Sequence, residues 1–340
     1  MQFGQIEIDQ AEGAIFAHSL RLPSLTLRKG DIVDAQAIAA LRSSGVKEIA
    51  GARLEPGDIG ENEVARRIAQ RLGGDHVEAR AAFTGRCNLF ATRNGLLRVD
   101  AMRIDRVNAI DEAITTATLA PLRRVAEGEM VATVKIIPFA IGAQTYARAC
   151  AATNQPALAI SPFTLRRAGV ISTRLPGLKS ATIAKTIHNL EARLSRAGAP
   201  LVSRAEVPHE AEALTIALRA VERQCDVIVI FGASAIVDRR DVVPTAIEAA
   251  GGQIEHFGMP VDPGNLLLLG TLRGLPVIGA PGCARSSKEN GFDFVLDRVL
   301  AQLPIKGADI RRLGVGGLLG EIGSRPQPRD GSRSQDKEHD

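Results

Sequence analysis

The residues best suited to chemistry lie in one stretch, where an apolar segment leads into small and acidic residues. Val227–Phe231 is apolar and mostly β-branched, which predicts a strand buried on both faces of a parallel sheet. Gly232, Ala233 and Ser234 follow, then Asp238 and Asp241, and a helix is predicted over 244–250. A strand, a small-residue loop and a helix can present backbone N–H groups to an anion. An ordinary turn with acidic caps explains the same pattern, so both interpretations stay open at this point.

Composition predicts a soluble, cytoplasmic protein of two domains. The chain has 340 residues, of which 45% are hydrophobic, and its net charge is +4. No apolar run approaches the ~20 residues that span a bilayer, and the first residues lack a signal-peptide pattern. Aromatic residues make up 3% of the chain and the arginine pairs are scattered, which argues against nucleic-acid binding. A mildly basic protein of this kind favours an anionic small molecule.

The four cysteines do not predict a metal site. Cys87, Cys150, Cys225 and Cys283 lie far apart, and neither a Cys-x-x-Cys motif nor a histidine cluster is present. We therefore expect reduced thiols that mostly fill space in the core.

Residues 1–165 are expected to form a smaller α+β accessory domain. Asp34 is predicted to cap a helix that ends near Gly45, and residues 61–72 show a second amphipathic helix. Residues 130–139 are the strongest strand of this half, and residues 84–88 are predicted to be a polar loop between strands.

Residues 166–308 are expected to form a three-layer αβα domain with a mostly parallel sheet. The predicted order is a strand at 168–171, helices at 180–198 and 211–223, the central strand, a helix to residue 250, a hairpin at 266–278 and a closing helix at 292–303. Residues 309–340 form an extension, with disorder predicted from about residue 324 because that segment is rich in Pro, Arg, Asp and Ser.

Over about residues 166–303 the sequence resembles the molybdopterin-binding domain of molybdenum cofactor biosynthesis. Adenylyltransferases and molybdenumtransferases that act on molybdopterin share this domain. The matching motifs are Phe231-Gly232-Ala233-Ser234, Arg240-Asp241-Val242-Val243-Pro244, Gly251-Gly252 to Pro260-Val261, Pro263-Gly264-Asn265 and Gly279-Ala280-Pro281-Gly282. Ordered matches at sensible spacings are far more specific than any one of them. The first half resembles a divergent accessory region that accompanies this domain in some bacterial proteins.

The resemblance implies a ligand, molybdopterin or its adenylylated form, which is a pterin dithiolene with a terminal phosphate. Backbone N–H groups around 232–234 and 282–287 would hold it. The implied binding residues are Gly232, Ala233, Ser234, Pro263, Gly264, Asn265, Pro281, Gly282, Cys283, Ser286, Ser287 and Lys288. The hydroxyls donate hydrogen bonds and Lys288 supplies a cation.

Asp238 and Asp241 are the catalytic candidates, because two carboxylates can hold Mg²⁺ or the amino edge of the pterin. Helix capping is the alternative role of Asp241, and the two roles are compatible. The family's second acidic position is replaced by Lys179 and Ser180, which leaves a metal fewer ligands. Cys283 stands in the turn after Gly282, where it can meet a dithiolene or molybdenum or simply fill a tight turn.

The sequence therefore predicts a molybdopterin-binding protein of molybdenum cofactor biosynthesis, with molybdate transfer to molybdopterin as the implied reaction. A carrier or insertion partner that serves a molybdoenzyme without turnover is the alternative, and a regulatory module with a vestigial pocket is a third. We also expect a homo-oligomer and neither a membrane nor a nucleic-acid partner. The ligand-binding interpretation needs the Gly232, Asp241 and Gly282 loops to converge on one cleft after the ends of the strands.

Overall fold

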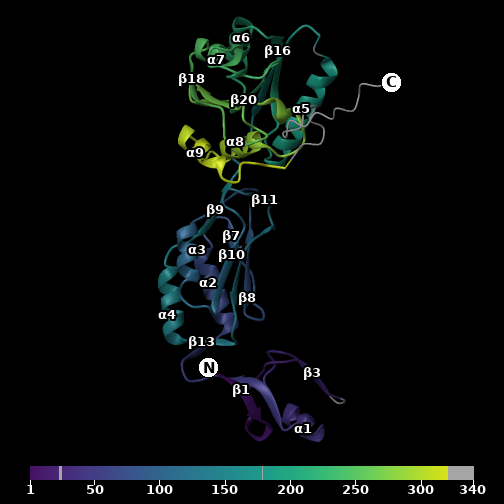
Figure 1. The fold of residues 1–340 in the computed structure, drawn as a ribbon, viewed down its shortest axis with the longest axis vertical. Coiled ribbons are helices and arrows are strands. Elements are labelled where there is room, and N and C mark those ends of the chain that lie inside the picture. The colour runs from purple at the N-terminus through teal and green to yellow at the C-terminus, as the bar shows by residue number, and fades with distance from the viewer. Residues whose placement is uncertain (23–24, 178, 321–340) are drawn as a thin grey trace, which may run out of the picture. The chain divides into compact units, whose positions relative to one another are not determined.

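The computed structural model describes residues 1–22, 25–177 and 179–320, and they divide into two compact units. Unit 1 is Met1–Pro162, and unit 2 begins at Phe163 (Figure 1). The disorder predicted from residue 324 concerns a segment outside the described residues. Within the described ranges, no helix has the length and apolar character needed to cross a membrane.

Unit 1 contains short sheets and four α-helices among its described residues. Its strands are β1 Gln2–Glu7, β2 Ile15–Phe16, β3 Leu20–Arg21, β4 Thr26–Leu27, β5 Glu48–Arg53, β6 Asp58–Gly60, β7 Val77–Ala79, β8 Arg86–Ala91, β9 Gly95–Val99, β10 Ile114–Thr118, β11 Arg124–Val125, β12 Met130–Ile136, β13 Ala140–Gly142 and β14 Leu158–Pro162. Its helices are the 3₁₀ turn η1 Ile8–Gln10 and α1 Ala35–Ser43, α2 Glu61–Leu72, α3 Ala101–Asn108 and α4 Ala143–Ala152.

Two hydrophobic clusters hold unit 1 together. The first joins α1 to the sheet β1-β5-β2, and Asp34 caps α1 as predicted by accepting a hydrogen bond from the Ala37 N–H. The second packs α2 against the sheet β10-β12-β8-β7 (Figure 1). The polar loop expected at 84–88 is shorter than predicted, because β8 begins at Arg86 and pairs antiparallel with β12.

Unit 2 is a six-stranded sheet between two layers of helices. Its strands are β15 Ala168–Arg174, β16 Leu201–Pro208, β17 Val227–Phe231, β18 Gly252–Phe257, β19 Leu268–Leu272 and β20 Leu275–Ala280. Its helices are α5 Ser180–Arg196, α6 Ala211–Val221, α7 Val242–Ala249, α8 Gly291–Leu300 and α9 Gly307–Arg311, with 3₁₀ turns η2 Gly282–Arg285 and η3 Arg312–Gly314. The strand order is β16-β15-β17-β20-β19-β18.

The first four strands of that order are parallel, and β19 is antiparallel to both of its neighbours. The predicted three-layer domain with a mostly parallel sheet is therefore confirmed. All five residues of β17 are buried, as expected for a central strand covered on both faces. Two strands, β16 and β18, were not predicted, because their alternating polar residues do not form an apolar run.

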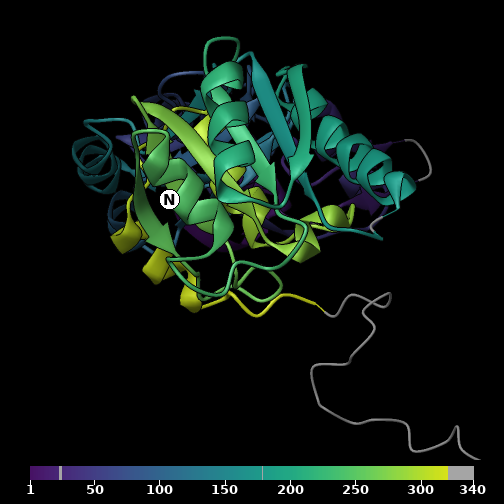
Figure 2. The ribbon, with the colours of Figure 1, turned by 90° about the horizontal axis from the view of Figure 1, so that it is seen from above.

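The two faces of the sheet carry different helices. Ile171, Ile228 and Ile230 pack against α6 and α7. Since side chains alternate along a strand, Phe231 points to the other face, where its ring centroid lies 6.4 Å from that of Phe292 in α8. Figure 2 shows α5 at one side of the sheet and the green helices α6 and α7 at the other. The parallel strands thus deliver their carboxyl ends to one edge, between the two helix layers.

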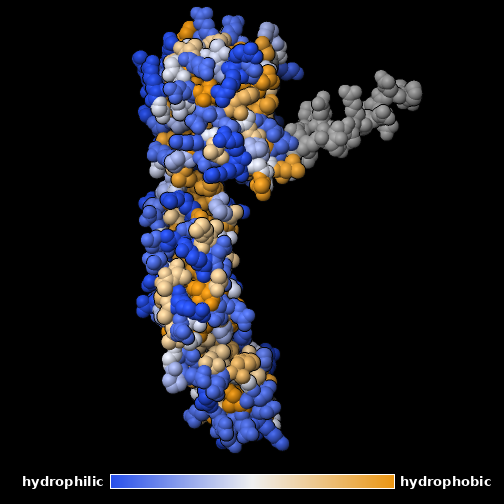
Figure 3. All heavy atoms as spheres, turned by 60° about the vertical axis from the view of Figure 1, so that its left-hand side comes forward, coloured by the Kyte–Doolittle hydropathy of each residue, from blue (hydrophilic) through white to orange (hydrophobic). Residues whose placement is uncertain are grey.

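Large exposed hydrophobic residues are scattered over the surface. Met102, Ile216 and Val237 are examples, exposed by 71%, 63% and 71% respectively. The face drawn in Figure 3 is mostly hydrophilic, with small hydrophobic patches. Small, scattered patches of this kind do not mark a binding surface, which leaves the edges of the sheet as the better candidates for a ligand site.

Candidate ligand site at the carboxyl edge of the sheet

The backbone of the loop after β17 is fixed by a hydrogen bond to the buried side chain of Thr173. Thr173, the penultimate residue of β15, accepts a hydrogen bond at its hydroxyl from the Ala233 N–H (2.8 Å) and contacts His209 Nδ1 (2.8 Å). Gly232 is required here, because a Cβ atom would lie 2.8 Å from the carbonyl oxygen of Ser234. The N–H groups of Ser234 and Ala235 have no acceptor among the described residues, so they can serve a ligand.

The two acidic candidates of this loop have structural partners. Asp241 caps α7 by accepting from the Val242 N–H (2.7 Å), and it also accepts from the Val237 N–H (3.2 Å). Asp238 pairs with Arg240 at 2.8 Å on the surface, and this hydrogen bond lowers the pKa of the Asp238 carboxyl. Capping is therefore one role of Asp241, and a role in ligand binding stays a prediction.

The two carboxylates of this loop are not part of a larger cluster of metal-binding side chains among the described residues. No group of three or more His, Cys, Asp or Glu side chains that could hold a metal occurs in the described part of the chain. Asp238 is engaged with a cation and Asp241 with a helix end, while the start of α5 carries Lys179. A Mg²⁺ ion at this loop would have at most these two carboxylates, and its other ligands would come from water or from the phosphate of a ligand, so magnesium binding stays a prediction.

The loop after β20 is shaped by helix α5. Asn189 Nδ2 donates to the carbonyl oxygen of Arg285 (2.7 Å), one turn before Arg193. Arg193 donates to the carbonyl oxygens of Ala284, Ser286 and Lys288, at 3.1, 2.7 and 3.1 Å. The charge of Arg193 is balanced by Asp293, 2.7 Å away, and both side chains are less than 10% exposed. One stripe of α5 therefore fixes the backbone of residues 284–288.

The predicted residues of this loop differ in exposure. Pro281 is buried, Cys283 and Ser286 are half-buried, and Gly282, Ser287 and Lys288 are exposed. Cys283 lies within η2, and Ser286 Oγ accepts from the Lys288 N–H (3.2 Å). A Cβ atom on Gly282 would meet open space, so a ligand can approach the backbone closely at this point.

Arg285 joins the β20 loop to the β17 loop, and sequence reasoning did not find it. Its Nη2 donates to the Gly232 carbonyl (2.7 Å) and its Nη1 to Thr186 Oγ1 (3.2 Å), while the guanidinium lies 5.6 Å from the centroid of the Phe231 ring. Burial lowers the pKa of Arg285. The sequence carries no signal for it, because an arginine in a polar loop looks the same whether it is half-buried or exposed.

The Pro263-Gly264-Asn265 motif forms the third loop of the candidate site. It packs against the start of α8, directly after the β20 loop, and is itself mostly buried. Pro263 accepts from the Gly291 N–H (2.8 Å) at the start of α8, and Gly264 packs so closely on Gly291 that a Cβ would lie 2.8 Å from its Cα. Asn290, the cap of α8, reaches back to the Lys288 carbonyl (3.0 Å). Only Asn265 of the motif is exposed, so Pro263 and Gly264 support the neighbouring loop from inside.

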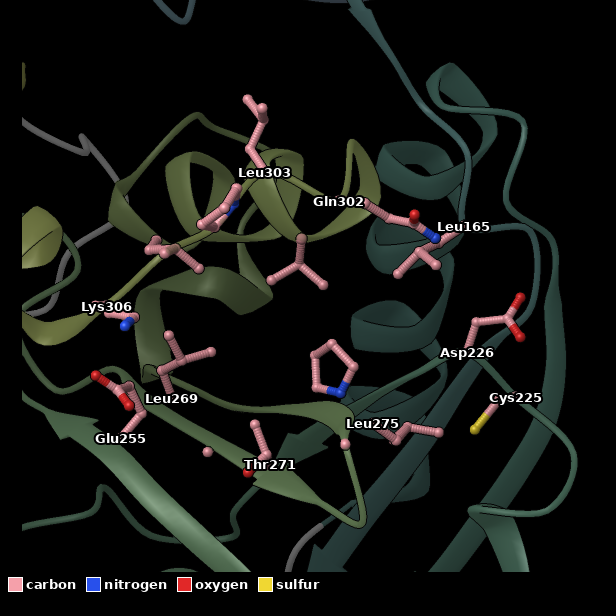
Figure 4. A pocket seen from close by; sticks show the side chains of 16 residues that line it. Leu165, Cys225, Asp226, Glu255, Leu269, Thr271, Leu275, Gln302, Leu303 and Lys306 are labelled. Carbon is pink, nitrogen blue, oxygen red and sulfur yellow. The ribbon is translucent and has the colours of Figure 1, made fainter.

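A separate cavity of about 660 Å³ lies at the opposite edge of the sheet. Figure 4 shows its walls, which include Leu269, Leu275 and Leu165, with Asp226 and Glu255 toward its ends. It is formed at the amino ends of β17 and β20, and none of the residues predicted to bind the ligand lines it. Two edges of one sheet must therefore be distinguished in any binding experiment.

Fold and loops define unit 2 as a doubly covered α/β domain with a loop cluster at the carboxyl ends of its parallel strands. Residues 169–302 match the family described as "Probable molybdopterin binding domain". This match confirms the resemblance seen in the sequence over about residues 166–303. Residues 5–53 match a second family, described as a domain of unknown function.

No curated protein matches the chain. Among solved structures it is similar to the molybdopterin biosynthesis MoeA protein of Pyrococcus horikosii, with 13% identity, a TM-score of 0.31, and coverage of 88% of this chain and 75% of that one. A molybdenum cofactor biosynthesis protein of Pyrococcus furiosus has 13% identity and a TM-score of 0.27, over 89% of this chain and 64% of that one. The protein CinA of Thermoplasma acidophilum has 15% identity and a TM-score of 0.29, over 35% and 90%. TM-scores of this size support no conclusion, and the assignment rests on the family match.

Proposed function

We propose that this protein binds molybdopterin, or its adenylylated form, at the carboxyl edge of the unit 2 sheet and acts in assembly of the molybdenum cofactor. The observation that supports the proposal best is the meeting of two loops within the family-matched residues. The β17 loop offers the N–H groups of Ser234 and Ala235, and the β20 loop offers the open backbone of Gly282. A pterin with a terminal phosphate needs such donors.

Direct titration tests this proposal. The chain has no Trp and one Tyr, so the fluorescence of the pterin can be followed without strong protein emission. We expect saturable binding of molybdopterin to the full chain, and binding at least ~10-fold weaker in Gly232→Ala, because the new Cβ displaces the loop that carries the donors. Arg204→Gln, on the far edge strand β16, serves as the control. Absence of saturable binding to the parent protein rejects the proposal.

Two forms of this function remain to be separated. Molybdate transfer requires turnover, whereas a carrier needs only tight binding. The carrier is favoured because both acidic residues already have partners in the protein. Asp238 pairs with Arg240, and Asp241 caps the start of α7. An assay of molybdate-dependent product formation with the bound pterin decides between them: product identifies a transferase, and tight binding without product identifies a carrier. The molybdoenzyme client and the homo-oligomer stay predictions.

A further inference from the structure

Two arginines hold the loop after β20, and they differ in how their charges are balanced. Arg193 has the carboxylate of Asp293 at 2.7 Å. The described residues place no carboxylate within ion-pair distance of Arg285. Its hydrogen-bond partners are the carbonyl of Gly232 and the hydroxyl of Thr186, both neutral. Arg285 is half-buried, and a cation that has lost part of its water without gaining a carboxylate points to an anion that is not part of the protein.

The guanidinium also retains hydrogen-bonding capacity. Arginine has five N–H groups, and only two of those of Arg285 have acceptors among the described residues. The two that are used fix the plane of the group, which lies over the Phe231 ring. A guanidinium with a fixed plane is suited to two parallel hydrogen bonds to an oxyanion, which a lysine could not provide in the same way.

An independent observation lies on the same face of the sheet. Ser172 is the register partner of Phe231 in the neighbouring strand, so its side chain points toward the layer of α5 and α8. It is 3% exposed, and its hydroxyl has no hydrogen-bond partner among the described residues. Buried hydroxyls are nearly always satisfied, so an unused hydroxyl on the strand beside Phe231, whose ring Arg285 covers, marks a polar position that a ligand or its water would complete.

We propose that Arg285 is the anion-recognition residue of the carboxyl edge and that it binds a phosphate-class oxyanion. The site lies between the β17 loop, the β20 loop and Thr186 of α5. Its assignment to the phosphate of a pterin rests on the proposed function, whereas the oxyanion site itself does not.

The test uses the full chain and inorganic phosphate as the probe, at constant ionic strength set with chloride. Thermal unfolding is followed against phosphate concentration for the parent, Arg285→Gln and Arg204→Gln. The two substitutions remove the same charge, but Arg204 pairs with Glu191 on the exposed edge strand. We expect a saturable rise in Tm for the parent and for Arg204→Gln, and at least ~10-fold weaker phosphate binding for Arg285→Gln.

A phosphate effect that is absent from the parent, or equal in Arg285→Gln, overturns the inference. Because each protein is compared with itself without phosphate, a change in basal stability does not affect the result. Thr186→Val provides a second variant, which keeps the charge of Arg285 and removes the hydroxyl that orients its guanidinium. Weaker phosphate binding by this variant supports the site, and unchanged binding contradicts it. Molybdopterin titration separates the two proposals. If Arg285→Gln binds molybdopterin as well as the parent does, only the role of Arg285 is contradicted. If the parent binds phosphate but not molybdopterin, only the proposed pterin ligand is contradicted.

Discussion

At the residue scale, buried and half-buried polar side chains shape the loops of the candidate site. Thr173, Arg193 and Arg285 each bond to loop backbone, and none of them was predicted. A sequence shows an arginine but not whether it is buried, and the scattered arginine pairs of this chain argue only against nucleic-acid binding. Asp241 was predicted with both of its roles open, and the structure shows the capping role.

The two roles of Asp241 can be separated by charge. Asn caps a helix about as well as Asp, whereas Ala costs roughly 0.5–2 kcal/mol. We expect Asp241→Ala to lower the free energy of unfolding by about that amount and Asp241→Asn to leave it nearly unchanged, as measured by urea denaturation. If the carboxylate also contacts the ligand, Asp241→Asn weakens molybdopterin binding without loss of stability. Normal binding by Asp241→Asn would limit this residue to the cap.

Arg193 is expected to be structurally indispensable. Its replacement by Met leaves Asp293 buried without its cation and three carbonyl groups without a donor. Breaking a buried pair in this way costs about 3–5 kcal/mol. Arg204→Gln removes an exposed pair and should cost less than about 1 kcal/mol. Equal losses in the two variants, measured by denaturant unfolding, would contradict the account of the loop.

At the element scale, the sequence predicted the strands and helices that have a strong apolar period. Residues 61–72 form α2 as expected, and Val227–Phe231 forms the central strand. Edge strand β16 was missed because its burial alternates and its exposed positions are polar or charged. The hairpin of β19 and β20 was predicted, but its turn is tighter than expected and consists of Arg273 and Gly274.

Two glycines of the candidate loops should respond differently to a methyl group. Gly264 has a φ of +144° and would push a Cβ against the backbone of Gly291, so Gly264→Ala should cost about 1–3 kcal/mol of stability. Gly282 has open space around it, and Gly282→Ala should change stability by less than about 0.5 kcal/mol. Thermal or denaturant unfolding measures both. A stable Gly264→Ala variant would show that the third loop does not support α8.

The thiol of Cys225, two residues before β17, has a shifted pKa. Burial raises the pKa of Cys225 to about 11 from an ordinary value of 9.0. Between these values the unfolded chain has released a proton that the folded chain keeps, so stability falls as the pH rises from about 9 to 11. Denaturant unfolding across this range should show a shallower decline for Cys225→Ala than for the parent protein. Identical slopes would mean that the thiol is not held neutral in the core.

At the scale of the whole molecule, the residues of the candidate site all lie in unit 2, within or beside the family match. The sequence predicted which half matches the molybdopterin-binding family and which strand ends carry the loops. It did not predict the cavity at the opposite edge, because Leu165, Cys225 and Leu303 come from segments that show no shared pattern. The N-terminal match to a domain of unknown function adds no chemistry to unit 1.

The central claim is that molybdopterin binds at the carboxyl edge of the sheet and not in the cavity at the amino edge. Titration of the full chain with molybdopterin can compare Gly282→Ala, which narrows the approach to the β20 loop, with Thr271→Arg, which places a long side chain in the cavity. The account predicts saturable binding by the parent protein, at least ~10-fold weaker binding by Gly282→Ala, and parent-like binding by Thr271→Arg. Binding that is lost in Thr271→Arg and kept in Gly282→Ala would contradict it.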